Sequence, residues 1–221
     1  MDEPSACTVP CMGRMSLSAA TAELARRDPH LAALVEQVGP LRWRARWSDP
    51  YGALVRAIAY QQLAGTAARA IHGRFLALFD GARPEPEAVL ALPDEAFRGA
   101  GLSAAKTASI RDLSQRVADG RVDLAHVSRL SDDRIVEQLS AVRGVGEWTA
   151  QMFLMFQLRR PDVWPTGDLG VRQGYALIHD LPERPTPKAL EGLGDVYRPL
   201  RSVAAMWCWQ AVALATGRRE R

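Results

Sequence analysis

The chain has 221 residues, of which 48% are apolar and 24% are charged. This composition is typical of a globular protein with one large domain or two small ones. The net charge of +3 is a small basic excess, which suits a nucleic-acid partner but equally an ordinary solvated surface. No apolar run is long enough to cross a bilayer, so we do not expect a membrane protein. The first residues also lack the basic and apolar segments of a signal peptide.

The chain contains three cysteines, Cys7, Cys11 and Cys208. An odd and sparse set suits a reducing compartment, and we expect the cytoplasm, at the bacterial nucleoid, or the nucleus. Cys7 and Cys11 could form half of a metal site, but the sequence offers no second pair. Both lie in residues 1–16, which show no periodicity and are predicted to form a flexible tail.

The first predicted helical region spans residues 18–38, where leucines and valines recur at helical spacing. Asp28 and Pro29 interrupt this region and predict the first turn of a second helix. Residues 41–47 alternate between arginines and apolar residues, which predicts a short strand whose tryptophans cover the edge of a core. Interleaved arginine and tryptophan could instead stack on nucleic acid.

The next helix is predicted to begin at Asp49 and to reach a turn that contains Gln61, Gln62 and Leu63. Two glutamines and a leucine at a turn of small residues make a poor core. An exposed leucine there could push between base pairs, as apolar wedges do in minor-groove binders. The residues alone nevertheless favour a core side chain for Leu63, and a wedge is the alternative.

Further helices are predicted over 110–118 and 132–139, and Ser131 or Asp132 would cap the second of them. Lys106 precedes the first of these helices. It is either an ordinary surface lysine or a contact to a phosphate group, and the sequence does not decide between the two.

Two glycines, Gly144 and Gly146, punctuate the turn that follows, so its backbone can come close to another molecule. Val145 between them requires burial and would hold the turn against the protein. A helix is predicted from about Glu147 to the proline at 161, and the amides of its first turn have no acceptor within the helix. Such amides, together with the helix dipole, favour phosphate binding.

Asp168 directly precedes a helix predicted over 169–178. An aspartate in this place is most often a helix cap, and a reactive carboxylate is the alternative. In the last helix, predicted over 199–216, Trp207 and Trp209 are two residues apart and point to different faces.

The segments LSAVRGVGEWTAQ (139–151) and PTGDLGVRQGY (165–175) resemble the helix-hairpin-helix/Gly-Pro-Asp superfamily of DNA glycosylases. Within it, they resemble the 3-methyladenine DNA glycosylase II type, in a short form without the N-terminal β-rich domain. The resemblance covers about residues 40–216. It implies an all-α fold of two helical subdomains with the active-site cleft between them.

The expected subdomain boundaries follow from the same resemblance. One subdomain would combine residues 17–48 with 162–221, and the other would span 49–161 with the hairpin at about 135–157. In this arrangement Asp168 corresponds to the catalytic carboxylate, which stabilises the cationic sugar.

The resemblance also implies the residues that contact DNA and the excised base. The base pocket would contain Trp148, Met152 and Trp209, which leaves Trp207 for the core. The intercalating residues would be Gln62 and Leu63. The phosphate contacts would come from Gly144, Gly146, Thr149 and Lys106. The main-chain carbonyls of Ser140, Val142 and Val145 would hold a sodium or potassium ion.

Relatives that also cut the DNA backbone carry a lysine on the second helix of the hairpin, which attacks the sugar through a Schiff base. This position is Trp148 here, and residues 139–175 contain no lysine. We therefore expect a monomeric, monofunctional glycosylase that excises alkylated bases of the 3-methyladenine and 7-methylguanine type from double-stranded DNA and leaves an abasic site. Cys208 alone cannot hold an iron–sulfur cluster, so none is expected. Two alternatives remain, a hairpin protein that only binds DNA and a glycosylase for a different damaged base.

Overall fold

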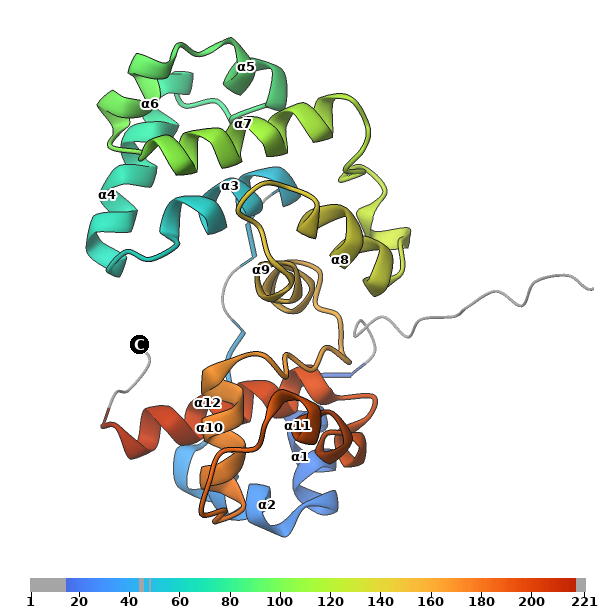
Figure 1. Cartoon of the computed structure of the whole chain (residues 1–221). Coiled ribbons are helices and arrows are strands. Elements are labelled where there is room, and N and C mark those ends of the chain that lie inside the picture. Colours follow the sequence, from blue (N-terminus) through green and yellow to red (C-terminus); the bar gives the residue numbers. More distant parts are fainter. Residues whose placement is uncertain (1–14, 44–45, 48, 218–221) are drawn as a thin grey trace, which may run out of the picture. The chain divides into compact units, whose positions relative to one another are not determined.

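The computed structural model describes residues 15–43, 46–47 and 49–217 (Figure 1). All regular structure in these residues is helical, which confirms the predicted all-α fold, and they contain no strand. Most of the predicted tail, with Cys7 and Cys11, lies outside the described residues. Among the helices described, none is both long enough and apolar enough to cross a membrane.

The chain divides into two compact units. The terminal unit combines Met1–Arg44 with Leu158–Arg221, and the central unit is Ala45–Gln157. The helices of the terminal unit are α1 (Leu17–Arg27), α2 (Pro29–Val38), α10 (Leu169–Ile178), α11 (Pro187–Leu193) and α12 (Arg201–Ala215), with the 3-10 turn η5 (Asp195–Tyr197). Helices α1, α2, α10 and α11 each begin behind a serine, aspartate or threonine that accepts a hydrogen bond from a first-turn amide. The local sequence therefore fixes where these helices start.

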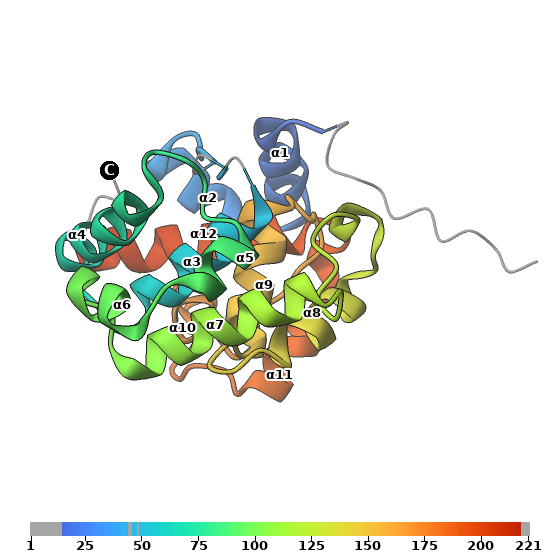
Figure 2. The ribbon, with the colours of Figure 1, turned by 90° about the horizontal axis from the view of Figure 1, so that it is seen from above.

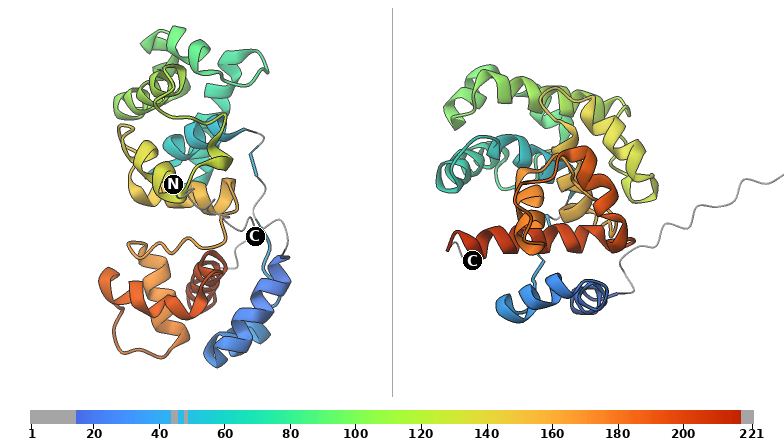
Figure 3. Two further views of the ribbon diagram at one scale, coloured as in Figure 1. Left: turned by 90° about the vertical axis from the view of Figure 1, so that its right-hand side faces the viewer. Right: turned by 60° about the horizontal axis from the view of Figure 1, so that its bottom comes forward.

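Helix α12 is the centre of the terminal unit and contacts α1, α2 and α10 (Figure 3). A Cβ atom at Gly174 in α10 would overlap the backbone carbonyl of Cys208 in α12, so only glycine permits this approach of the two helices. Trp207 is fully buried, as predicted, and its Nε1 donates to Oγ1 of Thr21 in α1 at 3.1 Å.

Asp28 joins the two N-terminal helices to the rest of this unit. Its Oδ1 caps α2 by accepting from the amides of His30 and Leu31. Its Oδ2 accepts a hydrogen bond from the hydroxyl of Tyr197 at 2.5 Å and lies 3.4 Å from Nε2 of His179. Burial, followed by the hydrogen bond to Asp28, raises the pKa of Tyr197. The buried carboxylate of Asp28, 6% exposed, therefore accepts hydrogen bonds at both of its oxygens.

The central unit contains α3 (Pro50–Tyr60), α4 (Gly65–Leu76), η2 (Ala77–Phe79), α5 (Pro86–Ala91), α6 (Asp94–Ala100), α7 (Ala104–Ala118), η3 (Val127–Arg129), α8 (Asp132–Ser140), α9 (Glu147–Met152) and a π-helix, η4 (Phe153–Gln157). Helix α7 packs against α3, α5 and α6 (Figure 2). The fully buried side chains around it are Val55, Ile58, Phe75, Val89, Phe97, Ile110 and Leu113. The hydroxyls of Tyr51 and Ser114 meet within this core at 2.6 Å.

The strand predicted over residues 41–47 is absent from the described part of that segment, and residues 44 and 45 lie outside it. The side chain of Gln157 replaces a neighbouring strand. Its Oε1 accepts from the amide of Trp47 at 3.2 Å, and its Nε2 donates to the carbonyl of Trp47 at 3.0 Å. The side-chain amide of Gln157 thereby satisfies both backbone groups of Trp47, as a neighbouring strand would.

The two tryptophans of this segment contact cations instead of covering the edge of a core. The guanidinium of Arg159 lies 4.2 Å from the ring centroid of Trp43, and that of Arg56 lies 5.5 Å from Trp47. Trp47 also meets the ring of His72 edge to face at 5.3 Å. Burial, followed by the charge of Arg56, lowers the pKa of His72 to about 4. Within the described residues, its Nε2 has no hydrogen-bond partner.

Candidate functional site

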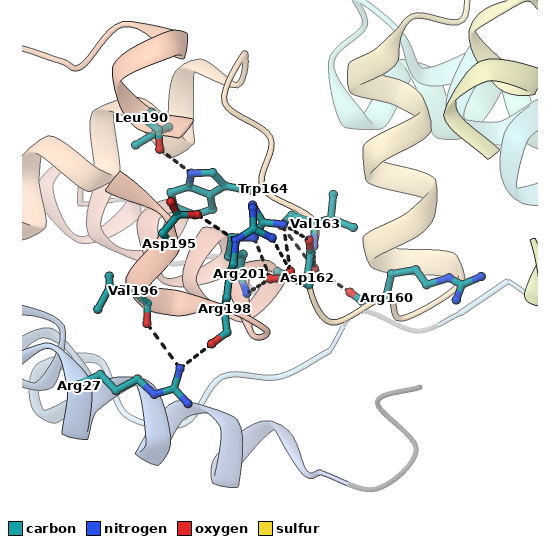
Figure 4. Close-up of polar contacts among 11 residues, drawn as sticks. Arg27, Arg160, Asp162, Val163, Trp164, Leu190, Asp195, Val196, Arg198 and Arg201 are labelled. Carbon is teal, nitrogen blue, oxygen red and sulfur yellow. Dashed lines mark hydrogen bonds and ion pairs between the residues drawn. The ribbon is translucent and has the colours of Figure 1, made fainter. Parts of the chain in front are cut away.

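The loop that leads to Asp168 is attached to the start of α12 (Figure 4). Arg201 contacts Asp162 through two atoms, Nε to Oδ1 at 2.7 Å and Nη2 to Oδ2 at 2.9 Å. Nη1 of Arg198 adds a third contact, to Oδ2, at 3.1 Å. A bidentate arginine–carboxylate pair fixes orientation as well as distance. The position and orientation of Asp162, and with it of this part of the loop, are therefore fixed relative to the start of α12.

Two further contacts hold the same loop. Oγ of the buried Ser202 accepts from the amide of Val163 at 2.9 Å and donates to the carbonyl of Arg160 at 2.7 Å. Nε1 of Trp164 donates to the carbonyl of Leu190 in α11 at 2.8 Å (Figure 4). The loop is thus bound to two helices, which restricts the position of the aspartate that follows it.

Asp168 caps α10 and contacts α12 at the same time. Its Oδ1 accepts from the amide of Val171 at 2.7 Å and from Nε1 of Trp209 at 2.9 Å. The amide of Asp168 donates to the carbonyl of Pro165 at 2.9 Å. Both Asp168 and Trp209 are half-buried. The two interpretations from the sequence, a helix cap and a carboxylate placed for chemistry, are therefore compatible.

The turn of the hairpin, between α8 and α9, is attached to α7. Gly144 has a φ of 71°, and a Cβ atom on it would lie 2.5 Å from Oγ of Ser109. The amide of Arg143 donates to Oδ2 of Asp112 at 2.7 Å. Val145 is 4% exposed and holds the turn against the core, as the sequence predicts.

The outer side of the turn carries backbone amides without internal acceptors. Among the described residues, the amides of Gly144, Gly146 and Glu147 donate no hydrogen bond. The amide of Thr149, a buried residue, also donates no hydrogen bond within the described residues. Free amides at the start of α9 form an arrangement that binds phosphate. The predicted helix continues as the π-helix η4 rather than as a regular α-helix, a deviation that often occurs at functional sites.

The turn between α3 and α4 presents Leu63, which is 38% exposed and does not lie in the core. Gln62 has a φ of 57°, which is uncommon for a residue other than glycine. Nε2 of Gln61 donates to the carbonyl of Gly144 at 3.0 Å. The predicted wedge is therefore connected to the predicted phosphate site. Sequence reasoning missed Gln61, because its partner lies 83 residues away.

Lys106 differs from an ordinary surface lysine, because its ammonium group already has a partner within the protein. Its Nζ donates to the carbonyl of Ala59 in the last turn of α3 at 2.7 Å. Burial lowers the pKa of its ammonium group. A cation at this place satisfies a carbonyl at the end of a helix, so a phosphate contact would have to share the same group.

The three predicted pocket residues and the predicted catalytic residue, Asp168, form two pairs. Trp148, which is 51% exposed, and the half-buried Met152 lie four residues apart in the central unit, a spacing that places them on one helix face. Asp168 and Trp209 are in contact in the terminal unit. The first pair therefore belongs to the central unit and the second to the terminal unit.

The predicted cation site depends on main-chain oxygens alone. Among the residues that the structure describes, no group of three His, Cys, Asp or Glu side chains could hold a metal ion. Ser140 ends α8, and the carbonyl of Val142 already accepts from the amide of Val145 at 3.0 Å.

Burial, followed by the charge of Asp168, raises the pKa of the Cys208 thiol, which keeps it protonated.

The sequence profile described as HhH-GPD superfamily base excision DNA repair protein matches residues 55–199, which include the hairpin and Asp168. DNA-3-methyladenine glycosylase 1 of Schizosaccharomyces pombe is 35% identical over 204 residues, 90% of this chain and 90% of that protein. A structure of S. pombe 3-methyladenine DNA glycosylase in complex with abasic DNA matches with a TM-score of 0.79 at 33% identity, over 91% of this chain and 99% of that chain. The crystal structure of DNA-3-methyladenine glycosidase from Bacillus halodurans matches with a TM-score of 0.81 at 33% identity, over 89% and 91% of the two chains.

Proposed function

Because the chain belongs to the HhH-GPD superfamily of base excision DNA repair proteins, we propose that it removes alkylated bases from double-stranded DNA by hydrolysing the N-glycosidic bond. The observation that carries the proposal is the half-buried carboxylate of Asp168, which N–H donors from α10 and α12 hold in place. The name of the S. pombe relative, DNA-3-methyladenine glycosylase, supports 3-methyladenine as a substrate. We extend the substrate class to 7-methylguanine, since it also carries a positive charge.

The chemistry follows from this carboxylate. As the C–N bond breaks, positive charge grows on the deoxyribose, and Asp168 stabilises it as glycosidase carboxylates stabilise oxocarbenium-like transition states. Partial burial strengthens the effect, because less water screens the interaction. An alkylated purine leaves as a neutral base and needs little help from an acid. The faces of Trp148 and Trp209, with Met152, would hold the cationic base in the pocket.

The central unit would bind the DNA around the lesion. The free amides at Gly144 and Gly146 would hold a backbone phosphate without reading the sequence. Leu63, preceded by Gln62, would occupy the space left when a nucleotide leaves the stack. The connection through Gln61 supports this assignment, because it couples the wedge to the phosphate anchor.

The proposed reaction ends with an abasic site and an intact strand. Trp148 occupies the position where a lyase would need a lysine, and residues 139–175 contain none. We propose a monomer that uses no cofactor apart from a sodium or potassium ion on the hairpin carbonyls of Ser140, Val142 and Val145. It would act where the DNA of the cell is kept, in the cytoplasm at the nucleoid or in the nucleus.

Release of free base from methylated duplex DNA tests the proposal, with strand breaks scored before and after alkali. Wild type should release base, with breaks only after alkali, and Asp168→Asn should be slower by about 100-fold or more. Asp180→Asn is the matched control, since it removes an exposed carboxylate from the same unit and should keep full activity. DNA binding without base release by wild type would favour a protein that only binds DNA. Unchanged activity of Asp168→Asn would exclude Asp168 from the reaction.

A further inference from the structure

The indole of Trp209 presents two different groups to the site. Its ring face could stack on a base, whereas its Nε1–H is already directed to Oδ1 of Asp168 at 2.9 Å. The two residues lie 41 positions apart, on different helices. This contact is therefore a product of the packing of α10 on α12 rather than of local sequence.

Two glycines of α10 make the contact geometrically possible. Gly174 allows the backbone of α12 to approach, because a Cβ atom there would overlap Cys208. One turn earlier, a Cβ atom on Gly170 would lie 2.8 Å from Cδ1 and 3.0 Å from Nε1 of Trp209. It would also lie 3.1 Å from Oδ1 of Asp168. The positive-φ glycines of the described chain do not include Gly170, so it is needed for space rather than for backbone conformation.

The donors on Oδ1 come from different helices. The amide of Val171 alone would give an ordinary helix cap, in which the carboxylate can still turn about its own axis. The indole N–H is fixed to a half-buried ring on α12, and a second donor at 2.9 Å restricts that rotation. Small errors in the position of a catalytic group reduce reaction rates strongly.

We propose that Trp209 is a positioning residue that orients the Asp168 carboxylate through its indole N–H, and that Gly170 is the glycine that makes room for this contact. The inference rests on the proposed function, since it assigns Asp168 to the reaction. A positioning role and a role as pocket wall require different parts of the indole. A wall needs the aromatic ring, whereas the positioning role needs the N–H.

Replacement of Trp209 by 3-benzothienylalanine separates the two roles, because sulfur replaces the N–H while the bicyclic ring keeps its shape. The rate constant of base release from methylated duplex DNA under single-turnover conditions should fall by about 10- to 100-fold. The protein concentration at which this rate constant is half-maximal should stay within about 2-fold of wild type, since stacking of the ring on the flipped base is retained. Gly170→Ala should reproduce the same pattern, and Gly192→Ala, where nothing lies within 4 Å of the added Cβ, should not.

The thermal unfolding midpoint of each variant shows whether it is folded. An analogue at position 209 that releases base at the wild-type rate would overturn the positioning role and leave the proposed function intact. A variant whose affinity for the methylated duplex falls as much as its rate of base release would also overturn it, because that pattern indicates a pocket wall. Wild-type protein that releases no base would overturn the proposed function, and with it this inference.

Discussion

The Gly144→Ala substitution tests whether Ser109 sets the shape of the hairpin turn. Alanine at this position would have to adopt a φ of 71°, and the left-handed region costs an L-residue about 1–2 kcal/mol. Its Cβ would lie 2.5 Å from Oγ of Ser109. If Ser109 rotates away, it loses its 3.0 Å hydrogen bond to the carbonyl of Ala105, at a cost of about 1 kcal/mol. Alanine also has fewer conformations than glycine in the unfolded chain, which offsets about 0.5 kcal/mol of this loss of stability. We therefore expect the free energy of unfolding to fall by about 2 kcal/mol.

Ser109→Ala supplies the matched background, because the Cβ of Ser109 lies 3.6 Å from the added Cβ, an ordinary contact distance. In the Ser109→Ala background, Gly144→Ala then carries only the cost of placing alanine at a positive φ. Substitution of Gly144 should cost about 1 kcal/mol less in this background than in wild type. Urea unfolding of wild type, both single variants and the double variant measures this coupling. A coupling below about 0.3 kcal/mol would refute the idea that Ser109 shapes the turn.

Three further predictions concern other parts of the chain. Gln61→Met keeps the length of the side chain but removes its donor to the hairpin carbonyl. Single-turnover base release should fall about 5-fold, as expected for one hydrogen bond, while affinity for undamaged duplex DNA stays unchanged. His72 has a folded-state pKa of about 4, so between pH 6.5 and 4 the unfolded chain binds a proton that the folded chain does not. The free energy of unfolding should therefore fall with falling pH, by up to about 1.4 kcal/mol per pH unit, and His72→Phe should flatten this slope in urea titrations. Gly174→Ala should lower stability by about 3 kcal/mol, because α10 and α12 must separate, whereas Gly192→Ala on an open face of α11 should raise it by about 0.5 kcal/mol.

Each of these predictions has an outcome that would contradict it. Loss of affinity for undamaged DNA in Gln61→Met would mean that the hydrogen bond supports the phosphate site rather than the wedge. The pKa of His179 is also lowered, by burial, so only the difference between His72→Phe and wild type is informative. Parallel pH profiles would show that His72 is not the source of the slope. Equal stability of Gly174→Ala and wild type would show that the helices can separate without cost.

The sequence predicts those features that depend on neighbouring residues. Caps such as Asp28 and Asp168 lie within three residues of the amides that they bind, so the helix starts could be predicted from local chemistry. The glycine-punctuated turn and the burial of Val145 could be predicted for the same reason. The spacing of Trp207 and Trp209 shows that they face different ways, but only the resemblance assigns the pocket to Trp209 and the core to Trp207.

Contacts between distant segments could not be predicted. Nothing in the sequence indicates that Gln61 rather than Gln62 binds the hairpin, or that Lys106 binds a carbonyl of α3. The pattern at 41–47 predicted a strand because it alternates, but the partner of Trp47 is a side chain from residue 157, which no local rule identifies. Local rules describe how a segment prefers to fold, whereas these contacts depend on which segments become neighbours in the fold.

Asp168 illustrates how one residue can combine structure and chemistry, and two substitutions separate them. Asparagine is about as good an N-cap as aspartate, and its side-chain oxygen can still accept from Val171 and Trp209, so Asp168→Asn should lose only the charge interaction with the helix dipole, about 0.5 kcal/mol. Alanine removes the acceptor as well and should cost about 1 kcal/mol more. Base release should be lost in both variants, because neither carries a negative charge beside the sugar. If urea unfolding shows this difference in stability while activity is equally low, the carboxylate has a chemical role that its role as a cap does not explain. If activity instead follows stability across the two variants, Asp168 acts only as a cap.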